Sequence, residues 1–80
     1  MLSKLEIDIL QHLYSENLTD SMKSRTVRNI AIAININLLR ARHNLNHLLS
    51  LEYVKLGWKE RNANTFHITQ KGIDLINRKT

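Results

Sequence analysis

Isoleucine recurs at every second position from Ile30 to Ile36, which is the spacing of a half-buried β-strand. The residues between them are alanine and asparagine, which are poor strand formers. As a helix, the same stretch leaves only Ile32 off a buried face made of Val27, Ile30, Ala31 and Ile34. The pattern therefore predicts a helix over residues 27–34 rather than a strand.

The polar residues on either side of this stretch predict where the helices begin and end. Thr26 is a good N-cap for the first helix, and Asn35 tolerates the left-handed conformation of a tight turn. We expect Ile36 to pack back into the core and Asn37 to cap a second helix that runs to about Ser50. Its buried positions would be Leu38, Ala41, Leu45, Leu48 and Leu49. The two helices and their short turn form a helix-turn-helix.

The flanking segments complete a small α+β arrangement. Residues 2–17 have helical apolar spacing with Ser3 as N-cap, and residues 18–24 are polar and unpatterned, as in a loop. Residues 53–60 and 65–69 predict two strands that pair through a turn at 61–64. Thr69 would cap a last helix over 70–79, where Gly72 permits close packing. The three aromatic side chains of the hairpin region are expected to pack in the core or across the strands: Tyr53, Trp58 and Phe66.

The pattern TVRNIAIAININLLRARHNLNHLLSLEYV, followed by the hairpin and ITQKGIDLI, resembles the winged helix-turn-helix of MarR, PadR and ArsR regulators. The residues that carry this resemblance, which covers residues 5–77, are Leu48, Tyr53, Val54, Ile68, Thr69, Lys71 and Gly72. It implies an α+β, mostly α, fold in one domain over residues 1–80: three helices, a two-stranded wing hairpin and a closing C-terminal helix. Asn35 stands where the family commonly has a turn glycine. Glu52 stands where a glycine usually ends the recognition helix, which predicts a different helix C-terminus here.

Charge is distributed unevenly along the chain. Residues 1–22 have a net charge of −3, whereas residues 23–59 carry seven basic side chains against one acidic, a net of +6. A basic middle segment beside an acidic one indicates a polyanionic partner that meets one face. There is no cysteine, and the longest apolar run spans five residues, so we expect a cytoplasmic domain with neither disulfides nor a membrane span.

The polar face of the second helix carries side chains that can read DNA. Arginine can pair with guanine, asparagine with adenine, and an exposed leucine can contact a thymine methyl group. Helical geometry turns the following residues outward or to the flanks: Asn37, Leu39, Arg40, Arg42, His43, Asn46 and His47. The resemblance implies base-facing positions for Asn37, Leu39, Arg42, His43 and Asn46, and we expect Arg40 and His47 to reach phosphates.

Further residues are candidates for backbone and wing contacts with DNA. Basic residues near the start of the first helix of the motif and in the wing could hold phosphates, and polar residues could assist them. These candidates are Lys23, Arg25, Thr26, Arg28, Lys59, Arg61, Asn62 and Asn64. The alternative for the helix arginines is a solvated helix face. However, no acidic residue lies four positions from Arg40 or Arg42 to pair with them.

The histidines do not predict a metal site, and no pattern predicts an enzyme. His43 and His47 have the spacing of two ligands on one helix turn, but His67 is the only evident third candidate. Catalytic triads, paired carboxylates and phosphate-binding glycine loops are not recognisable in the sequence. We expect no cofactor and no small-molecule ligand.

The sequence thus predicts a sequence-specific double-stranded DNA-binding protein, a small transcriptional regulator and more specifically a repressor, with helix 37–50 in the major groove. The alternatives are a winged-helix adaptor that binds protein instead of DNA, and a binder of single strands or RNA. A homodimer is expected. An apolar patch of Ile7, Leu10 and Tyr14 would either form its interface or be covered by the last helix through Ile73 and Ile76.

Overall fold

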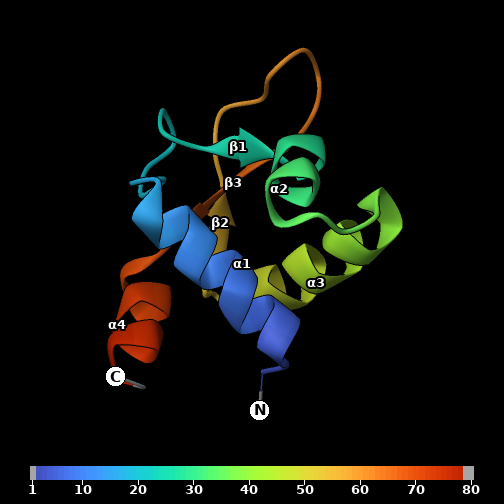
Figure 1. Cartoon of the computed structure of the whole chain (residues 1–80). Helices are drawn as coiled ribbons and strands as arrows, with labels where there is room; N and C mark the ends of the chain where they lie inside the picture. Colours follow the sequence, from blue (N-terminus) through green and yellow to red (C-terminus); the bar gives the residue numbers. More distant parts are fainter. Residues whose placement is uncertain (1, 79–80) are drawn as a thin grey trace.

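The computed structural model describes residues 2–78 and contains four helices and a small sheet (Figure 1). In chain order these are α1 (Lys4–Ser15), β1 (Arg25–Thr26), α2 (Val27–Ile34), α3 (Leu38–Ser50), β2 (Val54–Leu56), β3 (Thr65–Ile68) and α4 (Gln70–Arg78). The predicted order of helices, hairpin and closing helix is confirmed. The structure adds one strand to the predicted hairpin: β1 pairs antiparallel with β3 and gives the strand order β1-β3-β2.

The helices begin at the predicted caps. Ser3 and Glu6 form a capping box, in which each side chain accepts a hydrogen bond from the backbone N–H of the other. The Thr26 hydroxyl accepts from the N–H of Asn29, and the Asn37 side chain accepts from the N–H of Arg40. These bonds satisfy N–H groups that have no partner within their own helix.

The turn between α2 and α3 is the one predicted from Asn35. This residue has φ 61° and ψ 51°, which is left-handed backbone, and the next N–H, that of Ile36, bonds back to the carbonyl of Ala31 at 3.0 Å. Ile36 is half-buried, as its predicted return to the core requires.

The end of α3 differs from the sequence-based expectation. Glu52 has φ 66°, and the N–H of Tyr53 bonds to the carbonyl of Leu48, which is the same termination that glycine usually supports. The prediction of a different C-terminus is therefore wrong. A long-range contact supports the strained residue, since the Thr69 hydroxyl donates to the Glu52 carbonyl at 2.7 Å.

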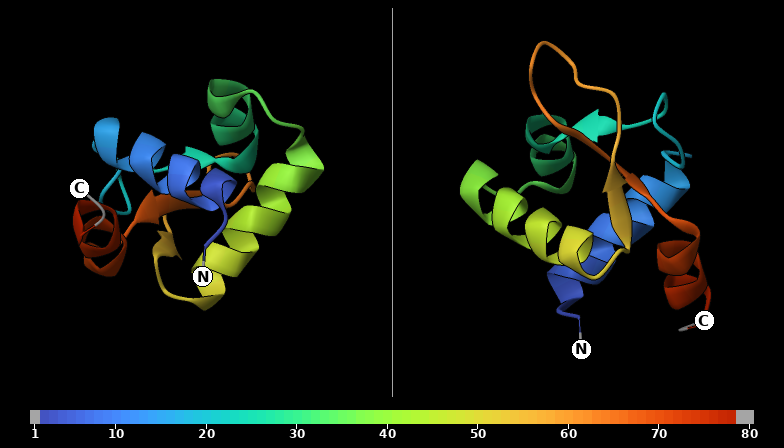
Figure 2. Two further views of the ribbon diagram at one scale, coloured as in Figure 1. Left: turned by 60° about the horizontal axis from the view of Figure 1, so that its bottom comes forward. Right: turned by 180° about the vertical axis from the view of Figure 1, so that it is seen from behind.

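The core lies between the helices and one face of the sheet. Its buried side chains come from every helix and from β2 and β3, and Ile9, Leu45 and Ile68 are among the largest that are fully buried. Leu10 is also completely buried, in the same cluster as Ile76 of α4. In both views of Figure 2, α4 lies next to α1 at the side away from α3. Of the two alternatives for the patch of Ile7, Leu10 and Tyr14, cover by the last helix therefore holds at Leu10, and a dimer interface at this residue is excluded.

Two apolar predictions for the helix-turn-helix and wing also need correction. Phe66 is buried, as predicted, but 66% of Trp58 is exposed, because this residue lies beyond the last pair of β2 and β3. Leu38 is also exposed rather than buried, and it lies at the start of α3 beside the wing.

Within residues 2–78, no helix is long and apolar enough to cross a membrane.

Candidate nucleic-acid interface

A groove of about 750 Å³ lies between α3, the start of α2 and the wing hairpin. We call it the wing groove. Its walls are Thr26, Val27, Arg28 and Asn29 of the α2 start, Leu38, Arg42 and Asn46 of α3, and Glu60, Arg61, Asn62, Ala63, Asn64 and Phe66 of the wing. The wing stands away from the body of the molecule beside α2 (Figure 1).

The wing groove collects residues that were predicted separately on three elements. Seven of the predicted DNA contacts line it: Thr26, Arg28, Arg42, Asn46, Arg61, Asn62 and Asn64. Three of these are arginines, and none of the three forms an ion pair with another described residue. Glu60 is the one acidic side chain on its walls. The groove therefore presents a net positive charge together with amide groups, which suits phosphate and base contacts.

The wing tip is a two-residue turn. Glu60 and Ala63 exchange both backbone hydrogen bonds, at 3.0 and 2.9 Å, and the two residues between them have φ values of 51° and 68°. Such turns usually contain asparagine or glycine, and Arg61 is an unfavourable residue at its first position. The turn is thus tighter than the predicted 61–64, and it places a guanidinium at the tip.

The base of the wing is held by hydrogen bonds that the sequence did not indicate. The Ser24 hydroxyl donates to Thr65 Oγ1, which in turn donates to the carbonyl of Trp58 at 2.6 Å. The N–H of Trp58 bonds to the carbonyl of Ser21. These bonds fix the base of the hairpin against the loop before β1.

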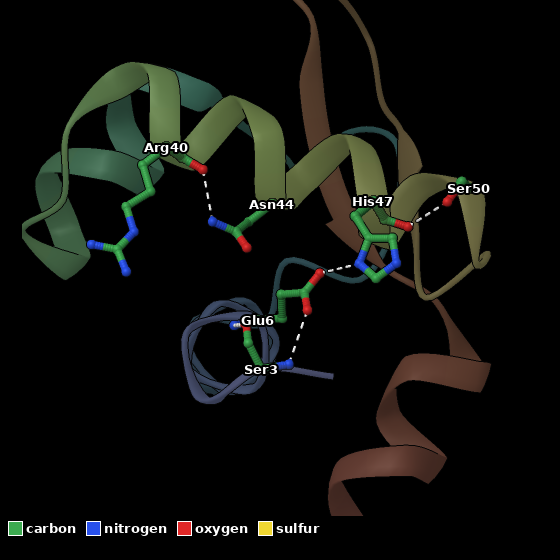
Figure 3. A network of polar contacts seen from close by, with 6 residues as sticks. All are labelled: Ser3, Glu6, Arg40, Asn44, His47 and Ser50. Carbon is green, nitrogen blue, oxygen red and sulfur yellow. Dashed lines mark hydrogen bonds and ion pairs between the residues drawn. The ribbon is translucent and has the colours of Figure 1, made fainter. Parts of the chain in front are cut away.

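The remaining predicted residues of α3 lie outside the wing groove. Leu39 and His43 are exposed on the outer surface of the helix, and 75% of Leu39 is accessible. Arg40 and His47 lie on the side that faces α1 (Figure 3). Asn37 is the N-cap, so its side-chain oxygen is already engaged. The predicted DNA-contacting residues of α3 therefore lie on three sides of the helix: along the wing groove, on the outer surface, and on the side that faces α1.

The basic residues before α2 and after β2 are also separate from the wing groove. Lys23 and Arg25 line a second, smaller hollow with Glu16, and Arg25 forms an exposed ion pair with that glutamate at 3.9 Å. An exposed pair of this kind contributes little to stability. Lys59 is exposed and lines neither hollow.

Histidine positions give no metal centre among residues 2–78. His67 is buried in β3, and its Nδ1 lies 3.2 Å from the carbonyl oxygen of Ile68. No three of the described histidine, aspartate and glutamate side chains gather as metal ligands would.

Sequence reasoning missed Asn29 and Glu60 as groove residues, because only the approach of the wing to α2 brings them together.

With this geometry established, comparison with known proteins identifies the family. No protein-family profile matches the sequence. The DNA-binding protein TubR of Clostridium botulinum C phage is 32% identical over 74 residues, covering 92% of this chain and 91% of that protein. The chain belongs to the TubR family of DNA-binding proteins.

Solved structures confirm the winged helix-turn-helix fold of this TubR-family protein. TubR from Bacillus megaterium pBM400 superposes with a TM-score of 0.85 at 17% identity, covering 98% of this chain and 86% of that one. The Staphylococcus aureus MepR–DNA complex gives a TM-score of 0.81 at 16% identity. Here the match covers 96% of the TubR-family chain and 60% of MepR. The chain thus corresponds to only part of that larger regulator, and likeness at this identity establishes the fold alone.

Proposed function

We propose that this TubR-family protein binds double-stranded DNA in a sequence-specific manner, with α3 in the major groove and the wing beside it. The observation that carries the proposal is the wing groove, where Arg28, Arg42 and Arg61 come together from three elements and form no ion pair with another described residue. Family membership supports the same conclusion, because the phage relative is a DNA-binding protein.

In this arrangement the predicted contacts divide by role. The side chains of α3 that lie on its outer face and along the wing groove read base edges, with Arg42 and Asn46 as the principal readers. Arg28 and Arg61 hold phosphates from the two sides of the groove. Lys23, Arg25 and Lys59 extend the backbone contacts beyond it. The helix N-termini at Thr26 and Asn37 add a small favourable interaction with phosphate.

We further propose that the protein acts as a homodimer and as a small cytoplasmic regulator that represses by occupying its site. Two copies would read two half-sites, which is the common arrangement for helix-turn-helix proteins. Leu10 does not contribute to the dimer surface, because it is buried within one copy. Light scattering of the free protein and of its DNA complex would give the stoichiometry, and one copy per site would contradict the dimer.

Fluorescence anisotropy tests the proposed function. The protein would be titrated against duplex DNA that contains a selected site, random duplex, single-stranded DNA and RNA of the same length, each at two salt concentrations. We expect the tightest binding to the selected duplex, and an affinity that falls steeply with salt because phosphate contacts release counterions. Equal affinity for all four nucleic acids would remove sequence-specific duplex binding from the proposal.

Absence of binding to every nucleic acid at low salt would instead favour the protein-adaptor alternative. Tighter binding to single strands or RNA would favour the third alternative, in which an exposed aromatic side chain stacks on bases. Trp58 is the exposed aromatic residue of the wing region that would serve in that role. The titration therefore separates the three functions with one set of measurements.

A further inference from the structure

The first turn of α3 carries two leucines that the core does not use. Residues 37–40 are all exposed, and the accessible fraction is 37% for Leu38 and 75% for Leu39. Further along the same helix, Leu45 and Leu48 are completely buried. Among the residues that the structure describes, neither Leu38 nor Leu39 belongs to the hydrophobic core or to the half-buried side chains that pack against it. Core packing therefore does not account for a leucine at either position.

Leu38 differs from Leu39 because it lines the wing groove. Leu38, Arg42 and Asn46 follow one another at intervals of four residues, and all three are walls of this groove. Residues four apart lie above one another on one side of a helix, so the three side chains form a single row. We call it the reading row. It begins with an aliphatic group, continues with a guanidinium and ends with an amide.

Each side chain of the reading row has a complementary group on the edge of a base in the major groove. The guanidinium of Arg42 matches O6 and N7 of guanine, and the amide of Asn46 matches N6 and N7 of adenine. The aliphatic side chain of Leu38 matches the 5-methyl group of thymine, which is an apolar group on the major-groove edge. An aliphatic side chain against a polar edge would deprive that edge of hydrogen bonds to water. Leu38 is therefore suited to thymine.

The position of Leu38 in the helix places it where bases are read. It is the first residue of α3, directly after the Asn37 cap. In helix-turn-helix proteins, the N-terminal residues of the helix in the major groove contact base edges. Successive members of the reading row are about 6 Å apart along the helix axis, which is roughly the height of two base pairs. Leu38 and Arg42 can thus meet different base pairs of one site.

We propose that Leu38 is a specificity-determining residue that selects a thymine through its 5-methyl group, within a few base pairs of the guanine that Arg42 reads. The inference rests on the proposed function and deepens it, because it names a base and the atom by which that base is recognised. The sequence pattern assigned Leu38 to the buried side of α3. Its place in the wing groove beside Arg42 assigns it to the DNA instead.

The experiment removes single methyl groups from the DNA. Deoxyuridine pairs with adenine as thymidine does and lacks only the 5-methyl group, so each thymine of the selected duplex is replaced by uracil in turn. Anisotropy titration of the wild type should find a thymine whose replacement weakens binding roughly three- to fivefold, as expected for one methyl group lost from an apolar contact. Leu38→Ala should bind the thymine duplex more weakly by a similar factor and lose nothing further on the uracil duplex.

The other variants separate this contact from general effects of an exposed apolar side chain. Leu38→Met keeps an apolar group of similar volume and should retain the preference for thymine. Ile32→Ala is the matched control, because it removes an aliphatic side chain that is 71% exposed and does not line the wing groove. It should also retain the preference. Alanine favours helix, and thermal unfolding checks that Leu38→Ala folds. If it melts far below the wild type, Leu38→Gln gives the same test with a polar side chain.

Three results would overturn the proposal while leaving duplex binding intact. One is a wild-type affinity that no single uracil lowers, and another is a preference for thymine that persists in Leu38→Ala. The third is a preference lost in Leu39→Ala but kept in Leu38→Ala, which would make the neighbour the reader. If Leu38 only packed against the wing, Leu38→Ala would weaken binding to both duplexes and keep the preference, which is the second result. If the wild type binds the selected duplex no better than random duplex, the proposed function fails as well.

Discussion

Left-handed backbone at residues other than glycine ends three of the four helices. Asn17, Asn35 and Glu52 have φ values of 58°, 61° and 66° directly beyond α1, α2 and α3. Asparagine tolerates this conformation, and the sequence therefore predicted Asn35 correctly. Glutamate does not, so the residue type at Glu52 did not predict the left-handed conformation. The Thr69 hydroxyl supports that conformation from the start of α4 by donating to the Glu52 carbonyl.

Glu52→Gly is expected to stabilise the protein. Removing the side chain relieves the cost of left-handed backbone, which is about 1 kcal/mol or slightly more for an ordinary residue, and part of the gain is lost to the greater freedom of glycine in the unfolded chain. Urea unfolding monitored by circular dichroism should show a higher midpoint, with an unchanged dependence of the unfolding free energy on urea concentration. Glu52→Ala, which retains a Cβ, is the control and should give no comparable gain. Destabilisation by glycine would show that the glutamate side chain itself matters.

The helices could be predicted from their own residues. The strand β1 could not, because it forms only by pairing with β3. The capping residues and apolar spacing were sufficient for α1, α2, α3 and α4. In contrast, β1 has two residues, too few for any alternation, and it exists because Arg25 and Thr26 lie opposite Phe66 and Thr65. The position of α4 depends on Gly72, which the sequence correctly indicated as a site of close packing.

Gly72→Ala tests how tightly α4 is seated. A Cβ at this position would lie 2.5 Å from the Tyr53 carbonyl oxygen and 2.8 Å from Cγ1 of Ile68, so α4 would have to move. We expect a loss of about 1–3 kcal/mol in the free energy of unfolding, typical of overpacking, despite the better helix propensity of alanine. Thermal or urea unfolding measures it. The control Gln70→Ala changes an exposed residue of the same helix and should remain within about 0.5 kcal/mol of the wild type. Equal stability of Gly72→Ala and the wild type would mean that α4 shifts without cost.

The molecule as a whole combines the separate basic residues into one surface. Arg28, Arg42 and Arg61 are far apart in sequence but share the wing groove, whereas Glu6 is withdrawn into the protein beneath α3. The net positive charge predicted an anionic partner. The fold decided which basic residues share one surface. The hydrogen bonds of Ser24 and Thr65 hold the wing, and the wing carries Arg61.

Arg42→Ala tests the base-reading role proposed for the wing groove. Removing a bidentate contact to guanine should weaken binding to the selected duplex by about 1–3 kcal/mol and change random duplex much less. Arg78→Ala is the matched control, because it removes the same charge from the end of α4. Anisotropy titration of both variants on both duplexes gives the comparison. An equal loss for Arg42→Ala on the two duplexes would reduce this residue to a phosphate contact.

The sequence by itself determined the helices, their caps, the Asn35 turn and the basic character of the middle of the chain. These features are local, because a cap or an apolar stripe is satisfied by residues within one or two turns. Only the tertiary structure decided that Leu10 is covered, that Trp58 is exposed, and that Glu6 lies behind His47. The cover of Leu10 by Ile76 and the contact between Glu6 and His47 each join residues more than thirty positions apart; Glu6 and His47 are 41 positions apart. Burial and buried charge are properties of the packed chain, and no local pattern encodes them.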